Sequence, residues 1–477
     1  MLNYNNIDLG DQNQGRKNRI HLVSNQSKEP LCDFDDFVTS NPEIDIMIDD
    51  PKTILKGIVS LLGVTSKDGF ESSDLLDTTI PRLCEIVASD EFDMQLKNNA
   101  IELIKSMCKA EPATTRKFFQ AYTKCGDENV RFYEYLLKIL KTQELYLSPV
   151  IKILSLFINW TNAAYRIIVI DNGYLDILIK LLTNNKLILQ DKHGVLNGIL
   201  NILKSRFFNE YDKLLDFVKL VSDFILNLDE YNEFILVKSY KIIALAFSKI
   251  PENKDYKIGF DIFPLFKKSF YLLRDKDIGI KTKINITYFI CNLLIHFENF
   301  VDFLITSNLL EIFNQLIKQN KTDELVINCL KTCYNCTYFS IKTNIKIIKS
   351  EFIENVYNCL FSNNDQILIE ALAIFQRLLN LEALDLPNII EIFNHFPMFI
   401  DAISEIIRTK NIEDVLIYSL SILANSILLL NNAQESLNIV SILYEKQDFI
   451  SKIHQTCCSN NLKISKLSNL LFKLINN

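Results

Sequence analysis

The chain has 477 residues, of which 48% are hydrophobic and 23% are charged, which is the composition of an ordinary folded protein. Its formal net charge of −7 argues against a chain-wide attraction to nucleic acid or anionic lipid, so we expect no direct nucleic-acid partner. Only 11 glycines and 10 prolines are present, and because sheet-rich and loop-rich enzymes need such residues in their turns, the composition favours a helical protein.

Residues 1–50 differ from the rest of the chain because they are polar. They contain a small basic cluster from Arg16 to Arg19, and then an acidic stretch with interleaved aromatic residues from Asp33 to Phe37. With so few apolar residues this segment lacks the means to build its own core, and the sequence predicts a flexible N-terminal tail. Two interpretations remain open, a disordered leader and a short linear motif that docks on a partner or on the protein's own groove.

Helical periodicity begins at Pro51, where Ile54, Leu55, Ile58 and Leu61 form one apolar stripe. Residues 74–108 then predict a helix, a polar break and a second helix, and the same arrangement returns in residues 323–360. One such unit cannot bury both of its apolar faces without a copy on either side. Residues 51–461 are therefore predicted to form one repeat array, and the amphipathic stretch 462–477 is predicted to be a C-terminal capping helix.

The repeat can be tested on one pattern, an apolar residue, a second one three positions later and an asparagine two positions after that. We call the last residue of each unit its ladder position. Five ladder positions are asparagines, and the other three units keep the apolar pair but not the asparagine; in chain order the positions are Ser106, Asn159, Asn201, Phe247, Asn292, Asn335, Arg377 and Asn425. Successive positions are 42 to 53 residues apart, and a period of this length over eight units is typical of an α-solenoid.

The helix that carries each ladder position resembles the third helix of the armadillo repeat, whose pattern is Ala-Leu-x-x-Leu-x-Asn-Leu. The segments Cys329-Leu330-x-x-Cys333-x-Asn335 and Ala371-Leu372-x-x-Phe375 carry this resemblance. Ile80-Pro81-Arg82-Leu83 and Gly173-Tyr174-Leu175 resemble the start of the second helix of that repeat. The resemblance covers roughly residues 75–477 and implies an all-α, right-handed armadillo or HEAT-like superhelix without a sheet.

In an armadillo solenoid the third helices line the concave surface, so the resemblance implies a peptide-binding groove along the ladder. The candidate site consists of the ladder asparagines and of residues one or two turns before a ladder position, namely Asn159, Asn201, Asn292, Asn335, Asn425, Tyr240, Tyr288, Lys331 and Tyr418. A carboxamide both donates and accepts, so it can clasp the two polar groups of one peptide unit of an extended ligand. The same side chain can instead bind neighbouring backbone and fix the packing of the repeats. The sequence leaves both roles open.

Three lysines at a regular spacing form a different series. Lys192, Lys238 and Lys283 each lie nine residues before a ladder position, which is half a helical turn away from it. We therefore expect a solvated face here and not a basic groove.

No residue pattern predicts catalysis, a metal or a cofactor. Cys329, Cys333 and Cys336 share one helical face, but a structural zinc site needs four ligands, and core packing is the better interpretation. The five histidines belong to no catalytic motif, and no phosphate-binding glycine loop is present. We therefore expect a protein that is not an enzyme.

The cell compartment is predicted from the cysteines, the N-terminus and the apolar runs. The 11 cysteines show no disulfide framework and favour a reducing compartment. The polar N-terminus does not resemble a signal peptide, and apolar runs such as 422–430 are too short to cross a bilayer. We expect a cytoplasmic protein that can also enter the nucleus, without membrane insertion.

Two functions fit these features. The first is an adaptor that binds extended protein segments, similar in layout to importin-α, with a slightly basic tail, a linker and an array with ladder asparagines; a net acidic chain would suit basic cargo. Importin-α also carries tryptophans four residues before its ladder asparagines, whereas the only tryptophan here is Trp160. The alternative is a structural scaffold in a cytoskeletal, ciliary or signalling assembly.

Overall fold

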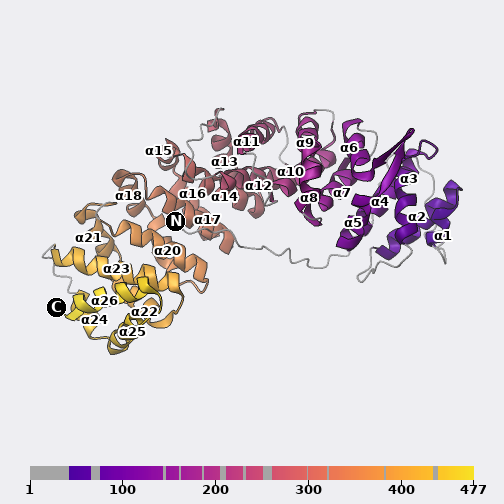
Figure 1. Cartoon of the computed structure of the whole chain (residues 1–477). Coiled ribbons are helices and arrows are strands. Elements are labelled where there is room, and N and C mark those ends of the chain that lie inside the picture. The colour runs from indigo at the N-terminus through magenta and orange to yellow at the C-terminus, as the bar shows by residue number, and fades with distance from the viewer. Residues whose placement is uncertain are drawn as a thin grey trace.

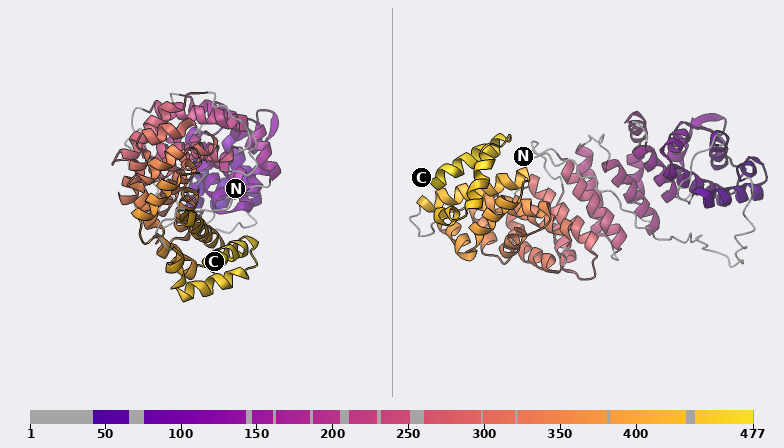
Figure 2. Two further views of the ribbon diagram at one scale, coloured as in Figure 1. Left: turned by 90° about the vertical axis from the view of Figure 1, so that its left-hand side faces the viewer. Right: turned by 90° about the horizontal axis from the view of Figure 1, so that it is seen from below.

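The computed structural model is an elongated, curved stack of helices (Figure 1). It describes residues 42–476 apart from the stretches 66–75, 143–146, 161–162, 185–186, 205–210, 229–231, 251–259, 298, 320–321, 381–382 and 433–438. Viewed along its length, the chain winds around a central axis (Figure 2). An all-α solenoid, as the sequence predicted, therefore accounts for nearly all of the described residues.

One row of helices runs through the whole molecule, because each member packs on the next. We call these the spine helices. They are α2 (Pro51–Thr65), α4 (Met94–Ala110), α7 (Leu147–Trp160), α10 (Leu189–Lys204), α12 (Glu233–Lys249), α14 (Ile280–His296), α17 (Asp323–Cys336), α20 (Asp365–Leu378), α23 (Glu413–Asn432) and α26 (Leu462–Asn476). The eight ladder positions fall one by one on the eight successive spine helices from α4 to α23, which confirms the repeat register.

The remaining helices cover the spine. They are α1 (Pro42–Met47), α3 (Leu76–Ala88), α5 (Pro112–Gln120), α6 (Phe132–Thr142), α8 (Ala163–Asp171), α9 (Tyr174–Leu182), α11 (Tyr211–Leu226), α13 (Phe263–Arg274), α15 (Asn299–Thr306), α16 (Leu309–Gln319), α18 (Ile341–Ile348), α19 (Phe352–Cys359), α21 (Leu386–His395), α22 (Phe399–Thr409), α24 (Ile439–Tyr444) and α25 (Gln447–Cys457). In Figure 1, α11, α13, α15 and α18 lie along the outer edge of the curve, and α12, α14, α17 and α20 lie on its inner side.

Several helices begin after a residue whose side chain satisfies the first backbone N–H groups. The side chain of Asn364 accepts from the backbone N–H groups of Gln366 and Ile367 at the start of α20, and Asp93 and Asp385 act in the same way on α4 and α21. Such caps contribute about 1 kcal/mol each. They also explain why the polar breaks between apolar stripes are rich in Asn and Asp.

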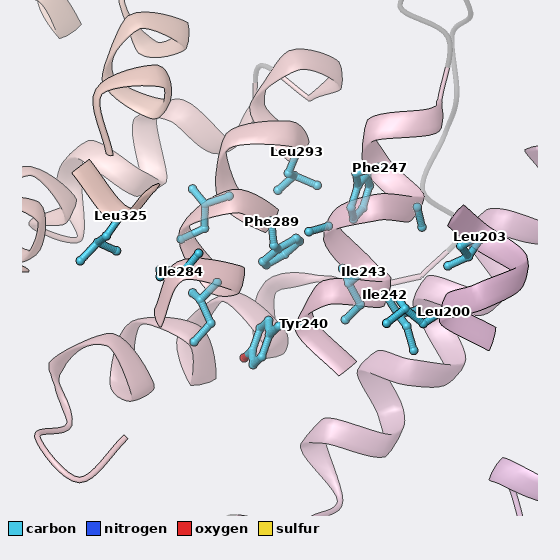
Figure 3. Close-up of a cluster of buried hydrophobic side chains, with 14 of the residues drawn as sticks. Leu200, Leu203, Tyr240, Ile242, Ile243, Phe247, Ile284, Phe289, Leu293 and Leu325 are labelled. Carbon is cyan, nitrogen blue, oxygen red and sulfur yellow. The ribbon is translucent and has the colours of Figure 1, made fainter. Parts of the chain in front are cut away.

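The core lies between the spine and the covering helices and is continuous along the chain. Figure 3 shows one part of it, where side chains such as Leu200, Ile242, Phe289 and Leu325 come from four consecutive spine helices. Because each repeat buries its apolar surface only against its neighbours, the stability of the array depends on the contacts between repeats.

The prediction that the chain contains no sheet is wrong. Strands β1 (Tyr122–Cys125) and β2 (Glu128–Arg131) form an antiparallel hairpin between α5 and α6. Gly126 has a φ of 64°, which suits the first central position of a two-residue hairpin turn. The hydroxyl of Thr123 donates to the carbonyl oxygen of Cys84 at 3.0 Å and fixes the hairpin to α3.

The predicted boundary of the N-terminal tail at residue 50 lies inside the packed structure. Residues 1–41 are outside the described part of the chain, but α1 packs on α2 and α3. The guanidinium of Arg82 donates to the carbonyl oxygen of Ile46 at 3.3 Å and contacts the carboxylate of Asp49 at 2.5 Å. The array therefore begins before Pro51.

The predicted capping helix is present as α26, but it is more than an appended cap. It packs on α23 in the same way as the earlier spine helices pack on one another, and α24 and α25 cover it. The stretch 439–476 is therefore a further three-helix repeat. The sequence pattern was correct for the helix and incomplete for its role.

Candidate functional site

The candidate site is the exposed side of the spine helices, which we call the spine face. Of the predicted companions of the ladder, Tyr288 on α14, Lys331 on α17 and Tyr418 on α23 are half-buried on these helices. Tyr240 on α12 is not on this face, because its ring is fully buried and its hydroxyl pairs with that of Ser269 at 3.0 Å (Figure 3).

The misplacement of Tyr240 has a geometric reason. Tyr240 lies seven residues before ladder position Phe247, and residues two turns apart share one helical face. Phe247 is itself fully buried in the core. Counting back from a core residue therefore leads to another core residue, and the prediction that Tyr240 lines the groove is wrong.

The ladder asparagines of the central repeats bind backbone of the preceding spine helix. The amide of Asn292 on α14 donates to the carbonyl oxygen of Ala244 on α12 at 3.0 Å, and Asn285, two turns earlier, donates to that of Val237 at 3.0 Å. Asn292 and Asn285 are only 6% and 9% exposed. Both amides therefore connect two repeats, and little of Asn292 remains accessible to a ligand.

The same pair of contacts returns one repeat later. On α17, Asn335 donates to the carbonyl oxygen of Cys291 at 3.0 Å and Asn328 donates to that of Ile284 at 3.3 Å. We call these four contacts the amide staples. They occupy the ladder position and the residue seven before it on two successive spine helices.

The hydrogen bond to the preceding spine helix is less regular at the other ladder asparagines. Asn425 on α23 donates to the carbonyl oxygen of Leu379 at 3.4 Å. Asn159 on α7 is exposed, and Asn201 on α10 is half-buried. Repeat packing, one of the two roles left open by the sequence, is thus confirmed for Asn292, Asn335 and Asn425.

The staples stop at the junction between α17 and α20. Here the ladder position is Arg377 and the residue seven before it is Glu370, where α14 and α17 have two asparagines. A carboxylate accepts hydrogen bonds and cannot donate one to a carbonyl. Glu370 instead accepts from the amide of Gln366 at 2.6 Å and lies 3.8 Å from the ammonium of Lys331 on α17.

Burial of Glu370 makes this contact electrostatically unusual. The residue is 7% exposed. Its burial raises the pKa of its carboxyl above the ordinary value, and the positive charge of Lys331 lowers it only in part. The junction therefore holds a desolvated charge pair where neighbouring junctions hold neutral amides.

Aromatic side chains surround the other charged group of this junction. The guanidinium of Arg377 lies over the ring of Tyr338, 4.7 Å from its centroid. The hydroxyls of Tyr338 and Tyr334 are in contact. Burial raises the pKa of Tyr334, and Tyr338 and Tyr418 on α23 raise it further. Tyr338 is 54% exposed, so this cluster reaches the surface. We call Lys331, Tyr334, Glu370, Arg377 and Tyr338 the central cluster.

The sequence did contain a signal for the central cluster. Arg377 was recognised as a ladder position without asparagine, and Glu370 lies at the staple spacing before it. What the sequence could not show is that Glu370 is buried and that Arg377 stacks on Tyr338 from the preceding repeat.

The lysine series behaves in three different ways. Lys283 on α14 is only 5% exposed and lies near Asp275 and Glu233, and the ammonium of Lys192 lies 5.7 Å from the ring centroid of Phe224. Lys238 on α12 is half-buried, and its positive charge adds to the effect of burial in lowering the pKa of His193 on α10. The prediction of a solvated face is therefore wrong for Lys283.

The three cysteines of α17 are core residues, as predicted. Cys329, Cys333 and Cys336 are fully buried, and burial raises the pKa of each thiol. Within the described residues, no group of three or more His, Cys, Asp or Glu side chains is placed to hold a metal ion.

One described helix is long and apolar enough to cross a membrane. This is the stretch Glu413–Leu430 of α23. However, 61% of it is buried inside the protein, where α23 packs between α20, α22 and α26. Its composition is accounted for by its place in the core of the array.

Comparison with known proteins gives a fold but no family. No protein-family model and no curated protein matches the sequence. The crystal structure of an engineered protein matches with a TM-score of 0.69 at 12% identity, over 92% of this chain and 100% of that chain. A designed armadillo repeat protein matches 55% of this chain and 100% of its own length with a TM-score of 0.42 at 15% identity. At 12% identity the first match shows a shared fold alone.

Proposed function

We propose that the protein is a non-catalytic helical-repeat adaptor whose spine face, from α14 to α23, binds an extended segment of another protein. The observation that carries the proposal is the α17–α20 junction. There the amide staples give way to charged and aromatic side chains, some of them exposed. Natural proteins depart from their own stabilising pattern most often at functional sites, because charges buried for stability alone are unfavourable.

The chemistry of this surface suits a flexible protein segment. Tyrosine and arginine provide large contact areas together with hydrogen bonds, and they are enriched where interfaces gain most of their energy. Asn335 is half-buried, and its amide nitrogen donates to the carbonyl oxygen of Cys291 at 3.0 Å and lies 3.6 Å from Sγ of the same residue, while its amide oxygen is a hydrogen-bond acceptor. It can therefore add a contact to ligand backbone while it holds two repeats together.

A narrower form of the proposal is a transport adaptor of the importin-α kind that moves between cytoplasm and nucleus. Its support is the layout of the sequence. The basic residues Arg16 to Arg19 lie outside the described residues, and the fold alone does not separate this adaptor from other protein-binding solenoids.

A structural scaffold is the second candidate, and exposed apolar side chains away from the spine favour it. Tyr271 on α13 is 59% exposed, Phe361 after α19 is 61% exposed, and Met398 before α22 is 61% exposed. Side chains of this kind on the covering helices suit large partners that pack on the outside of the curve.

Photo-crosslinking in cell lysate tests these alternatives. A p-azidophenylalanine at Tyr338 samples the spine face, and the same residue at Tyr271, which is equally exposed, samples the outer layer. The proposal expects Tyr338 to crosslink to a short sequence of a partner, mapped by mass spectrometry. Crosslinks from Tyr271 alone would contradict it and favour the structural scaffold.

A further inference from the structure

A second group of charged residues lies on the spine at the other end of the array. Lys105 and Lys109 are one turn apart on α4, and Lys152 is on α7, the next spine helix. Lys109 and Lys152 are exposed, and Lys105 is half-buried beside Glu102. We call Lys105, Lys109 and Lys152 the N-terminal cluster.

Because α4 packs on α7, Lys105 and Lys109 both lie near Lys152. Partial burial of Lys152, and then the positive charges of Lys109 and Lys105, lower the pKa of its ammonium group. Like charges held together in this way raise the free energy of the unliganded protein, and an anionic partner removes that cost. The N-terminal cluster is thus a local concentration of positive charge in a chain whose net charge is −7.

Lysines outnumber carboxylates on the spine helices between the two clusters. The carboxylates on α10, α12 and α14 are Asp191 and Glu233, each at the start of its helix. Lys238 lies on α12 near His193, and Lys281 is exposed on α14. In the central cluster, Lys331 and Arg377 outnumber the single carboxylate of Glu370. The negative net charge of the chain suggested basic cargo. The side chains of these spine helices are mainly positive, and they favour an acidic partner instead.

We propose that the spine face takes an extended protein segment rich in aspartate and glutamate, with acidic side chains on the N-terminal cluster and on the central cluster. This inference rests on the proposed function, extends the binding face from α14 back to α4, and adds the class of partner. Neighbouring helices pack about 8–10 Å apart, so the four steps from α7 to α17 span roughly 30–40 Å. An extended chain covers that distance with about ten to twelve residues.

An acidic protein segment fits this surface better than a nucleic acid. The carboxylates of Glu102 and Glu370 stand within the two clusters and would repel the evenly spaced phosphates of a nucleic-acid strand. A protein segment can place its carboxylates at intervals. Its neutral residues can lie between the clusters, against the half-buried Tyr288 on α14.

The test is selection of a displayed library of random 16-residue peptides against the full chain, followed by titration of the selected peptides. Two variants probe the clusters, Lys109→Glu with Lys152→Glu, and Lys331→Gln with Arg377→Gln. Lys346→Glu is the matched control, since Lys346 is an exposed lysine on α18, outside the spine. Melting curves of each variant show how much folded protein enters the titration.

We expect the selected peptides to be enriched in Asp and Glu. Each cluster variant should weaken their binding roughly tenfold or more, which corresponds to about 1.4 kcal/mol, and the control should not change it. Neutral or basic peptides that still depend on the clusters would overturn the acidic class and leave the proposed function standing. Peptides indifferent to both clusters would overturn both. Tighter binding of a 12-residue oligonucleotide through the same lysines would assign the surface to nucleic acid.

Discussion

The side-chain amide of Asn335 on α17 donates to the backbone carbonyl oxygen of Cys291 on α14 at 3.0 Å. One repeat earlier, Asn292 stands in the same relation to Ala244. Both asparagines therefore satisfy a carbonyl of the helix before them, so the residue type that suggested a grip on ligand backbone binds the protein's own backbone here. The proposed binding face and the joint between repeats therefore share Asn335.

The double variant Asn292→Ala with Asn335→Ala should lower stability. Each change leaves a backbone carbonyl oxygen without its hydrogen-bond donor and opens a small cavity between two spine helices. The free energy of unfolding should fall by roughly 1–3 kcal/mol per site. Urea unfolding measured by circular dichroism should show the loss, with Asn363→Ala, an exposed asparagine between α19 and α20, as the control. Unchanged unfolding together with lost peptide binding would return these residues to a ligand-binding role.

Gly57 should be needed for the docking of α1. A Cβ added at this position would lie 2.6 Å from the carbonyl oxygen of Pro42 and 2.9 Å from Cγ1 of Ile46. Gly57→Ala should therefore displace α1 and speed hydrogen exchange of the amides in 42–50, measured by mass spectrometry. Gly63→Ala is the matched control on the same helix, because no atom lies within 4 Å of its added Cβ. If α1 stays protected in Gly57→Ala, its packing on α2 is incorrectly described.

Among the described cysteines, Cys458 should be alkylated first in the native protein. Cys458 is exposed, whereas Cys108, Cys329 and Cys333 are fully buried and their thiols have pKa values raised by burial. Because the thiolate is the reactive form, iodoacetamide at pH 8 should label the buried three only after unfolding. Peptide mapping with and without urea measures this, and equal native labelling of Cys333 and Cys458 would contradict the placement of α17.

The sequence predicted the parts of this structure that repeat and missed the parts that occur once. Ladder positions from Ser106 to Asn425 recur, so their register was visible in one chain. The hairpin at Gly126 is a single short, polar insertion, and no period reveals it. The role of Asn335 could not be chosen because a carboxamide binds ligand backbone and protein backbone through the same atoms. The burial of Glu370 depends on α17, a contact that only the folded chain contains.

The last prediction concerns Glu370, whose carboxyl has a raised pKa in the folded protein because burial outweighs the charge of Lys331. The folded state therefore binds this proton more tightly than the unfolded state. Its contribution to stability is fully present below the unfolded pKa and is lost as pH rises through the folded pKa. Glu370→Gln removes the charge and keeps the shape. Its stability relative to wild type should accordingly rise between pH 4 and pH 7.

The measurement is a series of urea unfolding curves across this pH range, with Glu391→Gln as the control because Glu391 is exposed on α21. Lys331→Gln should act in the opposite direction, because it removes the positive charge that lowers the pKa of Glu370 and so increases the loss of stability with rising pH. A Glu370→Gln variant less stable than wild type at pH 7 would mean that the ion pair with Lys331 stabilises the α17–α20 junction. The charges there would then be explained by packing, and the central cluster would lose its main argument as a binding site.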